Sequence, residues 1–237
     1  MLAAISAAAM VVTTSAWQNT PPIPERHPGW GEGKGKQMIE FEVFYDLTCS
    51  GSAAMHPELQ EFLSMPFLGA TVRDAIFVNY AFEPLPYHHG SWIPHKIVPF
   101  IIDKCVIDPL GCKLPYYINF SFNNQNTILS ATDMSFNDIV TLWTGMVSQA
   151  FGWKQSDLLA LYAWETDTHN SEMRVRYNWK YSATQAVSST PSLAVNGIQV
   201  QEPPFDHVSM MQLLQDVYNA QQVKMAQQKQ YMFLQEE

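Results

Sequence analysis

The sequence predicts an α/β fold in which a large helical insertion separates a β-α-β half from a β-β-α half. Three observations predict this class. Apolar residues alternate with a period of two from Ile39 to Tyr45, which is typical of a strand. Residues 110–185 contain no convincing long strand, but several stretches carry apolar residues at helical spacing. The dipeptide Asn196-Gly197 then separates two short apolar runs, which is the strongest short-range signal for a β-hairpin.

Length and composition limit the kind of protein. A chain of 237 residues forms one large domain or one domain with an insertion. Hydrophobic residues make up 47% and charged residues 15%, so most of the chain is expected to fold. The net charge of -9 has the wrong sign for binding phosphates, and we expect no nucleic-acid partner. Three cysteines are too few for a disulfide scaffold, and no Cys/His set has zinc-ligand spacing, so no metal site is expected.

The first residues resemble a targeting segment. Residues 2–12 form an apolar run that ends in small residues before Trp17, as in a signal peptide, and the run is too short to cross a membrane. We therefore expect the secretory route, in the endoplasmic reticulum lumen or outside the cell. No Lys or Arg precedes Arg26, which is unlike both a usual signal peptide and an Arg-rich presequence. A mitochondrial location, a buried N-terminal helix and a retained anchor stay open as alternatives.

A linker and then a β-α-β unit are expected next. Residues 18–37 are rich in Pro and Gly, so residues 1–37 are interpreted as a leader and arm before a domain that spans 38–220. After the first strand, apolar spacing over residues 53–65 predicts a helix with Pro57 inside it. The β-branched and aromatic residues from Arg73 to Phe82 predict a second strand.

The helical insertion is expected over about residues 91–185. Its helices are predicted over 91–104, Ile139–Ala150, Ser156–Trp164 and Ser171–Ala186. A hairpin of Pro191–Val195 and Ile198–Gln201 should return the chain to the sheet. A last helix should begin after Asp206 and end near Ala220, before a Gln-rich and Met-rich tail over 221–237.

Cys49 is the candidate reactive residue. It lies where the first strand ends and the first helix begins, and there the unpaired backbone amides and the positive end of the helix dipole favour a thiolate. A buried structural cysteine is the alternative, because free Cys packs as a small hydrophobe. The polar neighbours Thr48 and Ser50 favour an exposed thiol over that alternative.

These elements and two motifs resemble the DsbA-like branch of the thioredoxin-fold superfamily over residues 39–220. The motifs are Cys-Ser-Gly-Ser at 49–52 and Ser-Thr-Pro-Ser-Leu-Ala-Val-Asn-Gly at 189–197. The resemblance implies a thioredoxin-like fold, a cis peptide bond before Pro191, and a substrate peptide held against the backbone of Thr190.

The departures from this pattern limit the chemistry. A dithiol oxidase needs a second cysteine where this chain has Ser52, so net disulfide donation by that route is excluded. Val43 stands where the branch often has a buried acid. What remains is a mixed disulfide between Cys49 and a protein or glutathione thiol, with Ser52 as the hydrogen-bond partner of Cys49.

Two hypotheses of different classes follow. The first is a monothiol thiol-disulfide oxidoreductase-like or thiol-dependent client-binding protein, with glutathione as a thiol co-substrate and no other cofactor. The second is a catalytically retired thioredoxin-like fold that serves as a binding or accessory subunit, with the arm or the tail docking a protein partner. A relative of kappa-type glutathione transferases is a weaker third hypothesis, because that group has a serine where Cys49 stands.

Cys105 and Cys112 flank a turn and could form a local disulfide in an oxidising compartment. The alternative is that one of them resolves a mixed disulfide of Cys49. The histidines at 88, 89 and 95 are interpreted as surface or structural residues rather than metal ligands. Core packing is expected for the tryptophans at 143, 153, 164 and 179, with a peptide-binding groove as the alternative.

Overall fold

Two parallel strands form the centre of the structure. The computed structural model describes residues 28–235, so the predicted leader lies outside the described residues. β2 (Glu40–Tyr45) pairs in parallel with β5 (Phe77–Phe82), and β6 (Ser192–Val195) pairs antiparallel with the other edge of β2. β7 (Ile198–Gln199) and β1 (Trp30–Gly33) complete the sheet in the order β1-β5-β2-β6-β7.

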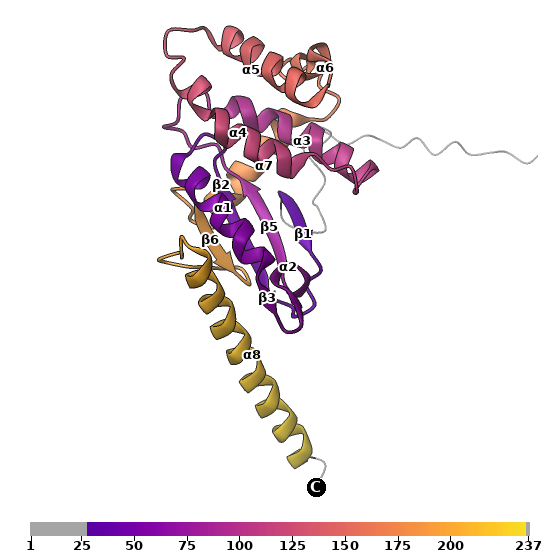
Figure 1. The fold of residues 1–237 in the computed structure, drawn as a ribbon, viewed down its shortest axis with the longest axis vertical. Helices are drawn as coiled ribbons and strands as arrows, with labels where there is room; N and C mark the ends of the chain where they lie inside the picture. Colours follow the sequence, from indigo (N-terminus) through magenta and orange to yellow (C-terminus); the bar gives the residue numbers. More distant parts are fainter. Residues whose placement is uncertain (1–27, 236–237) are drawn as a thin grey trace, which may run out of the picture.

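Helices account for most of the remaining described chain (Figure 1). They are α1 (Ser50–Ser64), α2 (Val72–Ala75), α3 (Trp92–Ile107), α4 (Leu114–Leu129), α5 (Phe136–Phe151), α6 (Gln155–Ala160), α7 (Ser171–Thr184) and α8 (His207–Gln235). A small hairpin of β3 (Pro66–Phe67) and β4 (Ala70–Thr71) follows α1. This arrangement confirms the predicted α/β class with a helical insertion.

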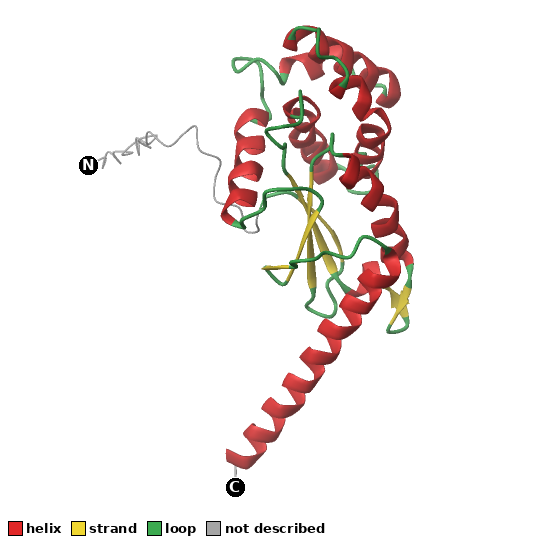
Figure 2. Cartoon of the chain, turned by 90° about the vertical axis from the view of Figure 1, so that its left-hand side faces the viewer, coloured by secondary structure: helices red, strands yellow, loops and turns green. Residues whose placement is uncertain are grey.

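Both faces of the sheet are covered by helices (Figure 2). On one face, Phe41 of β2 stacks on Phe62 of α1 at 5.5 Å between ring centroids. On the other face, Phe44 stacks on Tyr181 of α7 at 6.2 Å. β2 is therefore buried on both sides, as is usual for a central parallel strand.

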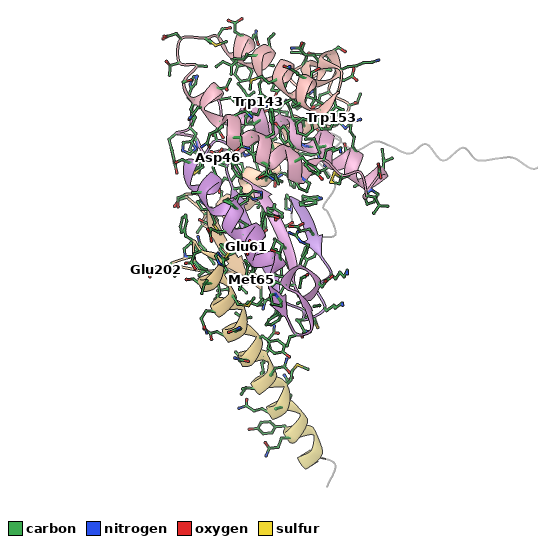
Figure 3. The ribbon with its side chains drawn as sticks, viewed as in Figure 1. Asp46, Glu61, Met65, Trp143, Trp153 and Glu202 are labelled. Atoms are coloured by element: carbon green, nitrogen blue, oxygen red, sulfur yellow. A yellow bond between two sulfur atoms is a disulfide. The ribbon has the colours of Figure 1, made fainter. Side chains whose placement is uncertain are left out.

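The helical insertion packs at the end of the sheet where α1 begins (Figure 1). Trp143, labelled in Figure 3, is fully buried and donates its indole N–H to the Tyr117 hydroxyl at 3.2 Å. Trp153 stacks on Phe151 at 4.8 Å. The expectation of core packing is correct for these two tryptophans. It is wrong for Trp164 and Trp179, which are 57% and 42% exposed.

The sheet includes a strand that the sequence analysis assigned to the arm. β1 lies inside the predicted linker 18–37, so the folded part begins before residue 38. Only Trp30 in this strand is apolar and large, and it packs on Tyr80 at 5.5 Å. A Cβ at Gly31 would lie 2.2 Å from the Phe77 ring, so this glycine permits close packing of an edge strand and does not mark a linker.

The last helix is longer than predicted. We expected it to end near Ala220, but α8 continues to Gln235 and projects away from the body (Figure 1). Val217 and Tyr218 are the last α8 residues that pack against the core. Gln, Met, Lys and Ala are good helix formers, so the helix continues where its apolar periodicity stops. None of the described helices is both long enough and apolar enough to cross a bilayer.

This division of α8 gives a first prediction. A chain that ends at Ala220 should keep the free energy of unfolding within about 0.5 kcal/mol of the full chain, because the removed turns lie beyond the packed part of the helix. Leu214→Ala, at a fully buried position of the same helix, should lower it by about 2–5 kcal/mol. Urea denaturation measures both, and a truncation as costly as Leu214→Ala would show that the projecting turns support the fold.

Candidate active site

Cys49 caps the N-terminus of α1 and contacts a loop 141 residues away. Its backbone is extended, with φ -81° and ψ 125°, and the helix begins at Ser50. The thiol Sγ lies 3.1 Å from the backbone oxygen of Thr190, to which it donates. The peptide bond between Thr190 and Pro191 is cis. The structure thus brings together Cys49, Thr190 and Pro191, which the sequence analysis named as candidate site residues.

Gly51 makes this approach feasible, and the sequence analysis gave it no role. A Cβ at Gly51 would lie 3.0 Å from Cδ of Pro191 and 3.4 Å from the oxygen of Thr190. A side chain here would push the cis-proline loop away from the start of α1. The sequence feature that could have indicated this close contact is a glycine in the first turn of a helix, where it lowers helix propensity.

Two local expectations are wrong. Cys49 is only 7% exposed, although its polar neighbours favoured exposure, because its thiol lies against the Thr190 oxygen. The neighbouring Thr48 hydroxyl turns inward and donates to Asp46. Ser52 is fully buried, but its hydroxyl has no hydrogen-bond partner in the described structure. The thiol of Cys49 donates to Thr190 instead, so Ser52 is not its hydrogen-bond partner.

A buried carboxylate organises the turn before Cys49. Asp46 Oδ1 accepts hydrogen bonds from the Thr48 amide and hydroxyl, both at 2.8 Å, and from the Ser91 hydroxyl at 2.7 Å. Asp46 Oδ2 accepts from the Leu85 amide at 2.9 Å and from His88 Nδ1 at 2.8 Å. Asp46 therefore ties the turn after β2 to the loop after β5. Its role is not visible in the sequence, because its partners at 85–91 come from a distant segment.

Electrostatics keep this carboxylate ionised. Burial by itself raises the pKa of Asp46, but the charge that His95 carries when protonated and the hydrogen bonds from Thr48, Leu85 and Ser91 outweigh burial and lower the pKa below its usual value. The His95 ring lies between the Ser91 oxygen, 2.7 Å from Nδ1, and the Leu47 amide, 3.4 Å from Nε2. Burial lowers the pKa of His95, so its ring is neutral at pH 7 and can accept from that amide.

Glu83 is a second buried acid at this end of the sheet. It is 3% exposed, and its Oε2 has no hydrogen-bond partner in the described structure. Burial, followed by the charge of Asp46, raises the pKa of Glu83 to about 7. Glu83 follows β5, whereas the sequence analysis looked for a buried acid at Val43 of β2. No signal in a single sequence distinguishes Glu83 from an exposed glutamate.

The other cysteines and the histidines have structural roles. A disulfide joins Cys105 at the end of α3 to Cys112 before α4, which leaves Cys49 as the free cysteine. His88 pairs with Asp46, and His95 is fully buried. In the part of the chain that the structure describes, no group of three His, Cys, Asp or Glu residues is placed to hold a metal ion.

Solved structures with the same fold include one described as a protein-disulfide isomerase and one named DsbA. BdbD from Bacillus subtilis aligns with a TM-score of 0.56 at 13% identity, over 80% of this chain and 92% of that one. A candidate protein-disulfide isomerase from Pseudomonas syringae gives 0.55 at 17%, over 75% and 90%. A DsbA variant from Pseudomonas aeruginosa gives 0.51 at 13%, over 86% and 94%.

These similarities define the class of fold. The chain has the thioredoxin-like fold of DsbA-like proteins, with a helical insertion, as the sequence resemblance implied. At 13–17% identity the similarity extends to the fold alone. No protein-family model matches the chain, and no curated protein sequence matches it significantly.

The Asp46 cluster leads to a stability prediction. Asp46→Asn should lower the free energy of unfolding by about 3 kcal/mol, because an amide nitrogen would face buried donors and leave some of them unpaired. Urea denaturation at pH 7 measures the change. The matched control is Asp133→Asn at an exposed position, which should stay within about 0.5 kcal/mol of the wild type. Equal effects of the two substitutions would show that Asp46 does not hold the loops.

Glu83 leads to a pH prediction. Its folded pKa of about 7 lies above the ordinary 4.5, so the folded protein keeps a proton that the unfolded chain releases. This contribution to stability is complete below pH 4.5 and is lost as the pH rises through 7. Between pH 5 and pH 8 the wild type should therefore lose up to about 3 kcal/mol of unfolding free energy relative to Glu83→Gln, which does not titrate there. A difference that does not vary with pH would contradict the raised pKa.

Proposed function

We propose that Cys49 is the nucleophile of a monothiol thiol-disulfide exchange reaction and holds client proteins through a mixed disulfide. One observation carries the proposal. The free thiol belongs to the N-cap residue of α1 and lies 3.1 Å from the backbone oxygen of Thr190, next to cis-Pro191, while a serine occupies the position where a resolving thiol would be needed. The DsbA-like fold supports this reading.

The chemistry is an exchange of one sulfur–sulfur bond. The Cys49 thiolate attacks a disulfide of a client or of oxidised glutathione, a bond to Cys49 forms, and the other sulfur leaves as a thiolate that takes a proton from water. Ser52 has no thiol with which to displace the client. Release then requires attack by an external thiol such as glutathione on the client sulfur. A disulfide between the client and glutathione forms, and Cys49 leaves as a thiolate. Thr190 and Pro191 would support the client backbone during the attack.

The disulfide between Cys105 and Cys112 supports an oxidising compartment, because such bonds persist on the secretory route and are rare in the cytosol. We therefore place the proposed reaction in that environment.

A second candidate is a retired fold that acts as a binding or accessory subunit. The observation that favours it is the burial of Cys49, which at 7% exposure offers little access to a bulky disulfide. In this case the fold would bind a partner without using the thiol, and Cys49→Ala would leave partner binding unchanged.

Incubation with oxidised glutathione distinguishes the two candidates. Intact mass analysis should find one added glutathione on the wild type and none on Cys49→Ala, with the Cys105–Cys112 disulfide retained. In Ser52→Cys the introduced thiol should attack the mixed disulfide and expel glutathione, so the adduct should be replaced by an internal disulfide. A wild type that stays unmodified from about pH 6 to pH 9 would overturn the thiol reaction and leave the retired fold.

A further inference from the structure

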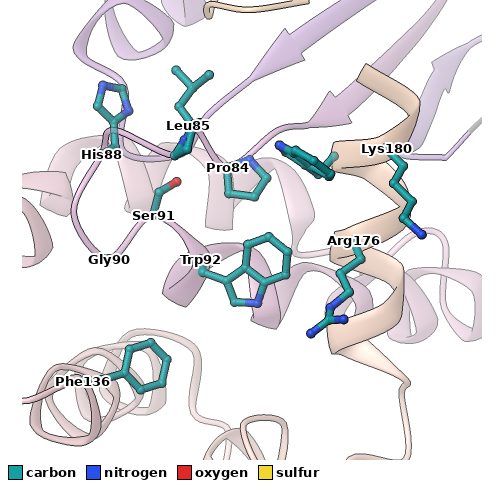
Figure 4. A pocket seen from close by; sticks show the side chains of 11 residues that line it. Pro84, Leu85, His88, Gly90, Ser91, Trp92, Phe136, Arg176 and Lys180 are labelled. Carbon is teal, nitrogen blue, oxygen red and sulfur yellow. The ribbon is translucent and has the colours of Figure 1, made fainter. Parts of the chain in front are cut away.

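A pocket lies between the loop after β5 and helix α7 (Figure 4). Its volume of about 610 Å³ lies within the ~300–1,000 Å³ that is typical of ligand sites. Part of the lining comes from α7 and from the start of α5, with Arg176, Trp179, Lys180 and Phe136. The rest comes from the loop after β5 and the start of α3: Pro84, Leu85, Pro86, His88, Gly90, Ser91 and Trp92.

The walls of this pocket are aromatic. Trp92, Trp179 and Phe136 line it together with Pro84 and Pro86. Trp179 is 42% exposed and Phe136 is 52% exposed, so these large apolar side chains are not used to form the core. Exposed aromatic side chains gathered in one concave site are typical of a surface that binds another molecule.

The charge beside the pocket is positive. Arg176 and Lys180 line it, and the buried Lys96 of α3 has its ammonium 3.2 Å from Glu172 Oε2. The single carboxylate of Glu172 also accepts from Trp92 at 3.0 Å and from Arg176 at 2.8 Å. Two cations, Lys96 and Arg176, therefore share one carboxylate, and Lys180 adds a further positive charge to the lining, in a chain whose net charge is -9.

Neighbouring acids do not cancel this excess. Asp46 is fully buried and pairs with His88, and Glu83 is 3% exposed and does not line the pocket. The pocket is thus complementary to a negative group beside an apolar one.

The pocket shares a wall with the Cys49 site. Leu85, His88 and Ser91 line the pocket and also donate to Asp46, three residues before Cys49. The hydroxyl of Tyr87, in the same loop, donates to the Ser188 oxygen at 3.4 Å, two residues before Thr190. The same loop therefore connects the pocket with the turn that leads into Cys49 and with the segment that leads into Thr190.

We propose that the pocket binds a client segment in which an aromatic side chain adjoins a carboxylate. The aromatic ring would pack against Trp92 and Trp179, and the carboxylate would pair with Arg176 and Lys180. The inference rests on the proposed function in one respect, since it names the class of client that the Cys49 site receives.

The test measures peptide binding in a Cys49→Ala background, where no mixed disulfide forms. The probes are acetylated and amidated hexapeptides of Gly and Ser with Phe-Glu, Phe-Gln or Phe-Lys at the centre, titrated by calorimetry at low salt. The Phe-Glu peptide should bind at least about threefold more tightly than the Phe-Gln peptide, and the Phe-Lys peptide should bind most weakly.

Substitutions in the pocket lining test whether the peptides bind there. Lys180→Gln and Arg176→Gln should each weaken the Phe-Glu peptide about threefold and leave the Phe-Gln peptide unchanged. Trp179→Ala should weaken both peptides. The controls are Lys154→Gln and Trp164→Ala, which are exposed positions of the same insertion outside the pocket lining and should change nothing.

Each other outcome overturns the inference. Equal affinity for the three peptides, no binding at all, or equal effects of Trp179→Ala and Trp164→Ala would show that the pocket does not select an acidic aromatic segment. Peptide binding needs no thiol, and the addition of glutathione needs no pocket. A negative result of the peptide titration would therefore leave the proposed reaction of Cys49 untouched, and the glutathione experiment tests that reaction separately.

Discussion

The buried carboxylate of Asp46 is the interaction on which the functional end of this molecule depends. An ionised carboxylate that is fully buried is costly unless its oxygens are satisfied, and here donors from its own turn and from the distant segment 85–91 surround both oxygens. The same bonds fix the turn that leads into Cys49 and the loop that lines the pocket. One charged group therefore sets the position of the thiol and the shape of the proposed client surface.

The cis-proline loop supplies the opposite constraint on Cys49. Gly51 leaves room for Pro191, and the Thr190 oxygen accepts from the thiol at 3.1 Å. Cys49 is thus held between the Asp46 turn that follows β2 and the loop that leads into β6. Such fixing on both sides accounts for its low exposure, and a client of the proposed reaction would have to displace the contact with Thr190 to reach the sulfur.

The parts of the site that could be predicted are those with local signals. Cys49 was identified from a strand–helix junction, and the paired roles of Thr190 and Pro191 came from a resemblance in two short motifs. Asp46 could not be found in the same way, because a strand-terminal aspartate followed by Leu47-Thr48 predicts only a local turn. Its partners 39–45 residues later are determined by the parallel pairing of β2 with β5. Trp179 carries the same helical spacing as a core residue, and only the packing of α7 shows that it faces the pocket.

Ser52 determines what a thiol at Cys49 can do. Its buried hydroxyl has no hydrogen-bond partner in the described structure, and an unsatisfied buried hydroxyl costs about 1–3 kcal/mol. The side chain therefore contributes nothing to stability through hydrogen bonding, and its consequence is chemical. With a hydroxyl in place of a second thiol, no internal group competes with an external thiol for a disulfide formed at Cys49. The lifetime of that disulfide then depends on the thiol concentration of the surroundings and on how firmly the client is held elsewhere, which is the role that an adjacent binding pocket would fill.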